Sequence, residues 1–223
     1  MIVDKNTNIY VGDTKIGKIC QGDNVIYNIL PIPSEYQKVE WIASSGTQYI
    51  KSEIIPNVNT FYDMKIESTN YQFWVFGCDK EWEDTGFGFQ GMSFRFASQQ
   101  YYLGFYNNTY QEIHPLNHNI LSFVSYVEPN KIIINDNQFD IITNTIQTDL
   151  ELYLFGQNRN NTAVDMSVGK IYYLKFYDNS TLIADFVPCY RKSDNEIGLY
   201  DVIRKKFYTN SGTGIFIKGN DVR

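Results

Sequence analysis

Cysteine and histidine are scarce in this chain: three cysteines and two histidines occur among 223 residues. An odd and sparse cysteine count does not fit a disulfide framework. No apolar run approaches the roughly 18 residues that a membrane-spanning helix requires. The chain opens with Met1-Ile-Val-Asp-Lys-Asn, which turns polar too early for a signal peptide. We therefore expect a chain that folds in a reducing cytoplasm and does not insert into a membrane.

Basic residues are fewer than acidic ones. Lysine and arginine number 19 against 25 aspartates and glutamates, so the formal net charge is −6. Nucleic-acid binding needs a positive surface field. The basic run Arg204-Lys205-Lys206 is short, and it predicts a solvated turn. We expect no nucleic-acid partner.

Aromatic residues are abundant, with 18 Tyr and 15 Phe, and these residue types suit half-buried strands. From Tyr36 onward, short segments that alternate apolar and polar side chains are separated by turn residues such as Asn135-Asp136-Asn137. The segment from Glu196 to Lys206 is the one place for a turn of helix, and Gly198 weakens it. About a dozen short strands with closely spaced turns predict an all-β sandwich or barrel.

The first 30 residues differ from the rest. The pattern strand, Gly-Asp turn, strand occurs twice, with turns at Gly12-Asp13 and Gly22-Asp23. We predict a small β-meander over residues 1–29, which is too small to be stable alone and packs on a partner chain or on the main domain. Residues 30–35 contain two prolines and predict an extended linker. The main domain is predicted over residues 36–223.

Three phrases frame this main domain. They are LPIPSEYQKVEWIASSGTQYI at residues 30–50, GKIYYLKFYD with DFVPCYRKSD at residues 169–194, and IGLYD with KFYTNSGTGIF at residues 197–216. In this order they resemble a module of bacteriophage structural proteins, of the tail, baseplate or head-fibre type, that contains a concanavalin A-like lectin/glucanase (laminin-G-like) domain. The resemblance implies a concanavalin A-like jelly-roll sandwich behind an N-terminal attachment segment. It does not identify a ligand.

Each phrase also has a structural interpretation. Gly46-Thr-Gln-Tyr-Ile predicts a turn that leads into a strand. Pro188 predicts the end of a strand, because proline removes a ladder donor. Asn210-Ser-Gly-Thr-Gly predicts a tight turn in which glycine permits a positive φ. We expect these phrases to define the fold rather than a binding site.

The resemblance further implies a place on the virion. Virion proteins fold in the host bacterial cytoplasm and leave at lysis, so the missing signal peptide agrees with this location. Residues 1–30 are then expected to bind other virion proteins. Proteins of this type are usually homo-oligomers, with a trimer favoured, because several weak sites together give avidity.

Related jelly rolls include glycoside hydrolases, which need two carboxylates that flank the scissile bond. Asp149 and Glu151 share one face of a strand, but the next residue on that face is Tyr153 rather than a third carboxylate. Glu53 and Glu67 have no partner in register. We predict no catalytic residues and no enzymatic activity.

No metal centre or cofactor is predicted. His114 and His118 stand among Pro and Asn residues that indicate a loop, whereas metal binding at this spacing needs a helix. Hard oxygen ligands for Ca²⁺ are available in one acidic stretch, but its spacing matches no specific calcium loop and favours a solvated turn. That stretch contains Asp79, Glu81, Glu83 and Asp84.

Carbohydrate recognition needs aromatic faces with Asn, Asp or Gln nearby, and two stretches combine them, at residues 79–84 and 98–110. In the second stretch, Tyr102 and Tyr106 share one face of a strand with Gly104, whereas Tyr101, Leu103 and Phe105 are predicted to face inward. In the first, Trp82 stands among charged residues. The alternative is that these aromatics only pack the two faces of a sheet. The candidate glycan-binding residues are Trp82, Asp84, Tyr102, Tyr106 and Asn108.

These observations predict a non-enzymatic adhesin or receptor-binding module that recognises a glycan on the host cell surface. The first alternative is a structural decoration or fibre protein of the capsid or tail, with no receptor of its own. The second alternative is a glycan depolymerase.

Overall fold

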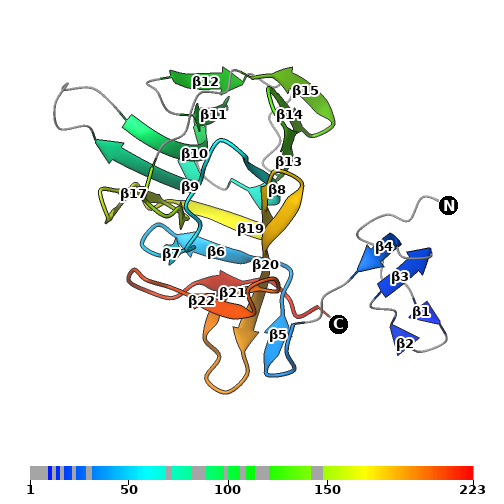
Figure 1. Ribbon diagram of the computed structural model, residues 1–223. Coiled ribbons are helices and arrows are strands. Elements are labelled where there is room, and N and C mark those ends of the chain that lie inside the picture. The colour runs from blue at the N-terminus through cyan, green and yellow to red at the C-terminus, as the bar shows by residue number, and fades with distance from the viewer. Residues whose placement is uncertain are drawn as a thin grey trace.

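The computed structural model describes residues 10–11, 14–15, 18–21, 24–28, 32–68, 72–81, 89–97, 100–105, 109–113, 121–141 and 148–222. Side chains are described for residues 32–68, 73–80, 93–95, 121–126, 128–141 and 148–222. Every element in these ranges is a β-strand (Figure 1). No helix in them is long and apolar enough to cross a membrane. The predicted all-β class is confirmed.

Two hairpins precede the main body. Strand β1 (Tyr10–Val11) pairs with β2 (Thr14–Lys15), and β3 (Lys18–Gln21) pairs with β4 (Asn24–Asn28). The strands on either side of each predicted turn therefore pair as expected, while the turn residues Gly12-Asp13 and Gly22-Asp23 lie outside the described residues. The hairpins form two separate two-stranded sheets, whereas the sequence predicted one meander.

The main body contains two large sheets. Strands of the 8-stranded sheet follow the order β12-β11-β10-β9-β16-β7, and β17 and β18 join it beside β9. Its strands are β7 (Ile50–Lys51), β9 (Gln72–Glu81), β10 (Phe89–Ala97), β11 (Gln100–Phe105), β12 (Thr109–Ile113), β16 (Tyr153–Leu154), β17 (Gln157–Arg159) and β18 (Thr162–Val164). All its pairings are antiparallel except that of β17 with β9.

Strands of the 11-stranded sheet follow the order β15-β14-β13-β8-β19-β20-β21-β22, with β5, β6 and β23 off this path. The first six along the chain are β5 (Tyr36–Lys38), β6 (Ile42–Ser45), β8 (Thr60–Glu67), β13 (Leu121–Glu128), β14 (Lys131–Ile134) and β15 (Asn137–Asp140). The remaining five are β19 (Val168–Asp178), β20 (Thr181–Arg191), β21 (Ile197–Asp201), β22 (Lys206–Thr209) and β23 (Ile217–Lys218).

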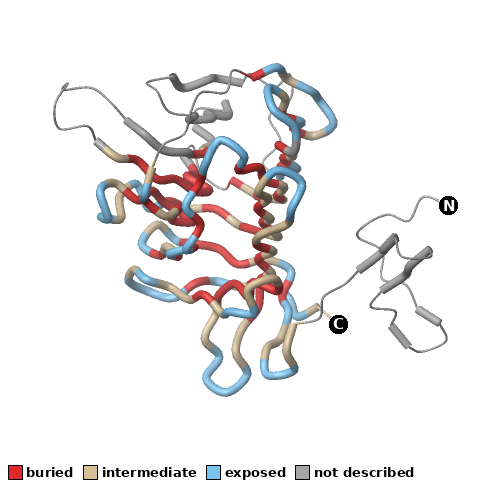
Figure 2. Tube along the Cα trace, in the orientation of Figure 1, coloured by how far each residue is buried: buried red, intermediate tan, exposed pale blue. Residues whose placement is uncertain are grey.

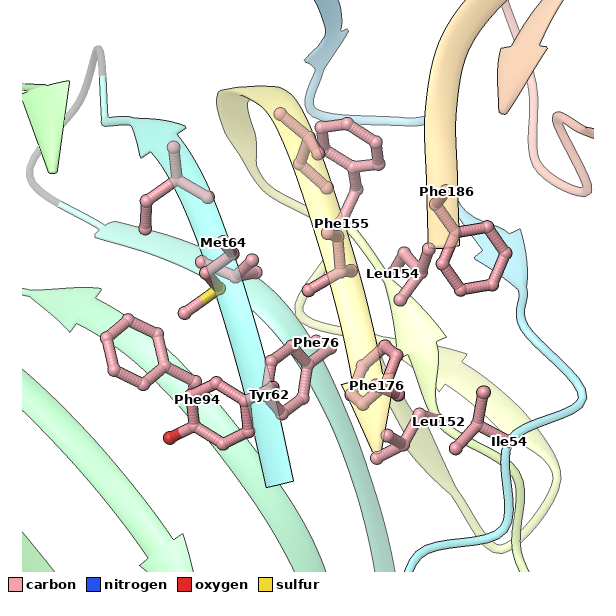
Figure 3. Close-up of a cluster of buried hydrophobic side chains, with 14 of the residues drawn as sticks. Ile54, Tyr62, Met64, Phe76, Phe94, Leu152, Leu154, Phe155, Phe176 and Phe186 are labelled. Carbon is pink, nitrogen blue, oxygen red and sulfur yellow. The ribbon is translucent and has the colours of Figure 1, made fainter. Parts of the chain in front are cut away.

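Aromatic side chains from both sheets meet in one core (Figure 3). Tyr62 of β8 lies edge-on to Phe76 of β9, with ring centroids 5.0 Å apart, and Phe76 meets Phe176 of β19 at 5.3 Å. Phe94 of β10 completes the group, and all four side chains are fully buried. Truncating a buried Phe to Ala typically costs about 3–5 kcal/mol of stability. These contacts hold the two sheets together as a sandwich, and buried residues run along both (Figure 2).

The turn chemistry predicted for the hairpins is confirmed. Asn135 and Asp136 have φ values of 48° and 65°, and they connect β14 to β15. Asn130 and Asn179 also adopt positive φ, at 62° and 52°, between paired strands. Asn and Asp tolerate this left-handed conformation better than other non-glycine residues.

One local prediction is wrong. Strand β20 does not end at Pro188 but continues to Arg191. On one edge, β20 pairs with β19 up to Phe186 and with β5 from Cys189. Pro188, which has no N–H, lies between these two pairings, so the strand can continue past it. The segment after Glu196 forms strand β21 rather than a helical turn, because its apolar residues pair with β20 and β22.

The first and third of the three motif segments, residues 30–50 and 197–216, form hydrogen bonds with each other. The Asn210 Oδ1 atom accepts the backbone N–H groups of Tyr49 and Gly212, and the Gln48 Nε2 atom donates to the Ile215 carbonyl. A Cβ atom on Gly212 would lie 2.2 Å from the carbonyl oxygen of Thr47, which leaves room only for glycine. This agrees with the structural interpretation of both phrases.

A second, smaller apolar cluster covers part of the outer face of the 11-stranded sheet. Ile32 and Tyr36 pack against Cys189, Tyr200 and Phe207 there. The chain is therefore fixed to this face from Ile32 onward, within the segment predicted as an extended linker. The other end of the chain lies beside it, since the backbone N–H of Val222 donates to the Lys38 carbonyl (Figure 1).

Gly169 of β19 faces the ring of Phe73, and an added Cβ would lie 2.5 Å from the nearest ring atom. We expect Gly169→Ala to lower the free energy of unfolding by about 1–3 kcal/mol, because overpacking forces the ring out of place. Urea denaturation measures this change. Phe73→Leu should relieve part of it in the double variant. A Gly169→Ala protein as stable as the wild type would contradict this packing.

Burial raises the pKa of the Asp185 carboxyl, and Asp201 and Asp63 add to the increase against the opposing ammonium groups of Lys175 and Lys38. A raised pKa in the folded state means that this group contributes stability at low pH, which is lost as the pH rises through the folded pKa. We expect Asp185→Asn to gain stability relative to the wild type as the pH rises from about 4, the unfolded pKa, towards neutrality. Denaturation midpoints across this range test it, and a difference independent of pH would contradict it.

Candidate functional site

Most of the sequence-predicted glycan-binding residues lie outside the described part of the chain. These are Trp82, Asp84, Tyr106 and Asn108. The backbone of Tyr102 lies in β11, where Tyr102 is the register partner of Arg95 on one side and of Glu112 on the other. The predicted site as a whole therefore stays a prediction.

The outer face of the 8-stranded sheet carries an unusual concentration of buried polar groups. A bulge in the pairing of β9 with β10 leaves Val75 without a partner. On the far side of the bulge, Phe76 and Cys78 face the core, whereas Gly77 and Asp79 face outward. Trp74 also faces outward, and the Arg95 guanidinium lies 4.8 Å from its ring centroid. Strand β9 thus places an aromatic residue and a carboxylate on the same outer face.

Asp79 is the centre of a closed polar network. Its side chain is 1% exposed, and its Oδ2 atom accepts hydrogen bonds from Gln157 Nε2 and Arg159 Nε, each at 3.3 Å. Arg159 Nη2 in turn donates to Gln157 Oε1 at 3.3 Å. The parallel pairing of β17 with β9, which sets Arg159 opposite Asp79, makes this possible. The network neutralises a buried carboxylate and fixes the guanidinium, whose side chain is 39% exposed.

Tyr49, Lys51 and Tyr153 lie on the same face. Tyr153 is the register partner of both Lys51 and Gly77, and its ring stacks on that of Tyr49 with centroids 5.0 Å apart. The Tyr153 ring is almost fully buried, whereas Tyr49 is half-buried and Lys51 is exposed. Tyr49 therefore offers the accessible aromatic surface, and Tyr153 supports it.

The carboxylates considered for hydrolysis are engaged in other contacts. Asp149 forms an ion pair with Lys80 at 2.7 Å, which lowers the pKa of its carboxyl. Glu151 accepts the backbone N–H of Glu53 at 2.7 Å. Hydrogen bonds from Lys206 chiefly lower the pKa of Glu53. A glycosidase needs one carboxyl with a raised pKa as general acid, and neither Asp149 nor Glu53 meets this requirement.

Asp79, one of the oxygen ligands considered for Ca²⁺, is already engaged. Asp79 accepts hydrogen bonds from Arg159 and Gln157, so it serves the polar network, while Glu83 and Asp84 lie outside the described residues. His114 and His118 also lie outside them. Within the described ranges, no group of three or more His, Cys, Asp or Glu residues is placed to hold a metal ion.

Sequence reasoning did not find Gln157, Arg159, Tyr49 or Lys51. The polar run Gln157-Asn-Arg follows a buried apolar strand, but nothing in it indicates a parallel pairing with a segment 80 residues away. Tyr49 and Lys51 belong to the first phrase, which was interpreted as structural.

Comparison with known proteins supports the fold only. No family model matches the chain, and no curated protein matches its sequence. Among solved structures, the chain is similar to a candidate carbohydrate-binding protein from Bacteroides ovatus ATCC 8483, with a TM-score of 0.50 and 12% sequence identity. The similarity covers 92% of this chain and 66% of that protein, so this chain spans slightly less than two thirds of its length.

The network predicts that Asp79→Asn is costly. The change removes the buried charge that holds Arg159, and we expect the free energy of unfolding to fall by about 1–3 kcal/mol. Chemical denaturation measures this fall. Asp149→Asn is the matched control, since both partners of its ion pair are exposed and its effect should be clearly smaller. Equal effects of the two substitutions would show that the Asp79 network does not support the sheet.

Proposed function

We propose that this protein is a glycan-binding β-sandwich that binds its ligand on the outer face of the 8-stranded sheet. The observation that carries the proposal is the Asp79–Gln157–Arg159 network, which presents a fixed guanidinium on the same face as Tyr49. Sugar binding combines an aromatic face for C–H groups with oriented polar groups for hydroxyls. The structural neighbour named for carbohydrate binding agrees with this ligand class.

We further propose that the protein is a bacteriophage adhesin with a concanavalin A-like fold, located on the virion and attached through residues 1–30. The contacts of Ile32 and Tyr36 support this arrangement, because they fix the chain from Ile32 onward to the outer face of the 11-stranded sheet, opposite the proposed glycan face. Attachment through that segment leaves the glycan face open. A homo-oligomer, with a trimer favoured, would repeat the face and add avidity for a host surface glycan.

The decoration protein remains the second candidate, because exposed apolar side chains and internally paired charges share the outer face of the 11-stranded sheet. Register places Ile217, Ala43, Lys170, Glu67 and Leu121 side by side on five strands. The exposed residues of this face include Ile217 at 55%, Phe123 at 44% and Leu121 and Ile133 at 36%. A structural protein of the particle would bury such a face on its neighbours.

A glycan array probed with the full chain tests the binding function. We expect saturable binding to a subset of glycans and roughly tenfold weaker binding by Tyr49→Ala, because an accessible aromatic contact often dominates the affinity. Phe123→Ala is the matched control: it removes an exposed aromatic from the opposite face and should bind like the wild type. If Phe123→Ala lost binding and Tyr49→Ala kept it, the site would be on the other sheet.

Binding of the labelled protein to host cells, with unlabelled virions as competitor, tests the adhesin role. Saturable binding that virions block supports it. If the oligomer binds no cells, and particles without the protein break down at lower temperature or salt, the decoration function is correct instead.

A further inference from the structure

The acceptor atoms of the Asp79 network are buried, whereas its guanidinium reaches solvent. The Asp79 Oδ2 and Gln157 Oε1 atoms are acceptors, but both side chains are about 1% exposed and both atoms accept hydrogen bonds from Arg159. Among the described residues around this network, the guanidinium of Arg159 and the side chain of Lys51 reach solvent, and so does the carboxylate of Asp165, which is 39% exposed and pairs with Arg159. A ligand that pairs with Arg159 and Lys51 must therefore supply acceptor oxygens.

The geometry of Arg159 narrows the class of acceptor. Its Nε and Nη2 atoms bond to Asp79 and Gln157, and Nη2 lies 3.6 Å from a carboxylate oxygen of Asp165. No contact of Nη1 is found among the described residues. A guanidinium fixed along its Nε–Nη2 edge by a buried carboxylate leaves Nη1 to donate to a ligand, and a planar guanidinium suits the oxygens of an oxyanion.

Lys51 adds a second cation to the same face. Its ammonium lies 5.8 Å from the centroid of the Tyr153 ring, and no described carboxylate lies within 4.0 Å of it. Among the described residues, the acidic groups near this rim are Asp149, Glu151 and Asp165. They pair with Lys80, with the Glu53 backbone N–H and with Arg159, respectively. In a chain of net charge −6, the described part of this face therefore places Arg159 and Lys51 within reach of a ligand.

We propose that the glycan bound by this face is acidic, and that Arg159 and Lys51 bind its oxyanion groups. This inference rests on the proposed glycan-binding function and names the ligand class. The shared chemistry is a negatively charged oxygen pair on a sugar, which either a uronic-type carboxylate or a sulfate ester supplies. The Asp79 carboxylate acts as a positioning residue, because it holds the guanidinium of Arg159 and touches no ligand itself.

Matched polysaccharides test the ligand class directly. Binding of the full chain is measured to polygalacturonate and to its fully methyl-esterified form, which has the same backbone without the charge. Dextran sulfate and neutral dextran form a second matched pair that separates sulfate from carboxylate. We expect at least tenfold tighter binding to one charged polymer than to its neutral counterpart.

Variants then locate the contact. Arg159→Gln should lose about tenfold in affinity for the charged polymer, and Arg159→Lys should recover only part, since lysine keeps the charge without the planar guanidinium. Lys51→Ala should weaken binding several-fold, and its exposed position makes unfolding a negligible concern. Lys131→Ala, on the other sheet, is the charge control and should bind like the wild type. Thermal melting of each variant checks that it is folded.

The possible failures are distinguishable. Equal binding to a charged polymer and its neutral partner, with unchanged binding by Lys51→Ala, overturns the acidic-ligand inference and leaves the glycan-binding function standing. Loss of binding in Lys131→Ala as large as in Lys51→Ala would mean non-specific attraction to a polyanion, and this also overturns it. No binding to these polymers or to any member of a broad glycan array overturns the inference and the proposed function together.

Discussion

Packing of Phe76 between Tyr62, Phe94 and Phe176 is the contact on which the rest of this structure depends. It joins the two sheets, and it fixes which side of β9 faces the core. Because side chains alternate along a strand, burial of Phe76 and Cys78 forces Gly77 and Asp79 to the outer face. The position of the polar network follows from the aromatic core, and a shift of one residue in β9 would bury Asp79 among phenyl rings.

The two outer faces of the sandwich differ in chemistry. On the 8-stranded sheet, a buried carboxylate holds an arginine on the same face as a half-buried tyrosine. On the 11-stranded sheet, exposed aliphatic and aromatic side chains alternate with internally paired charges, such as Lys170 with Glu67 at 2.6 Å. The N-terminal segment also joins the body on this second face. This division assigns ligand binding to one face and attachment or assembly to the other in our proposal.

Much of the fold could be predicted from the sequence, because strand alternation and turn chemistry are local. Asn135-Asp136 forms the turn between β14 and β15 from its own backbone preference, and the short N-terminal strands β1 to β4 pair as their local pattern predicts. Pro188 was misinterpreted because the cost of a missing N–H depends on which neighbour lies beside it, and β20 exchanges β19 for β5 at this point. The candidate binding site is harder to predict from the sequence than the fold. Arg159 meets Asp79 only through a parallel pairing that no local pattern encodes, and Trp82, Asp84, Tyr106 and Asn108 lie outside the described residues.

The most direct test of the central claim is a backbone NMR titration of the full chain with a glycan that it binds on an array. At 26.0 kDa the protein is suited to amide-detected spectra. We predict that resonances of Tyr49, Lys51 and Arg159 shift in a saturable manner while those of Leu121 and Phe123 stay in place. Shifts confined to the outer face of the 11-stranded sheet would contradict the assignment of the glycan site to the Asp79 network.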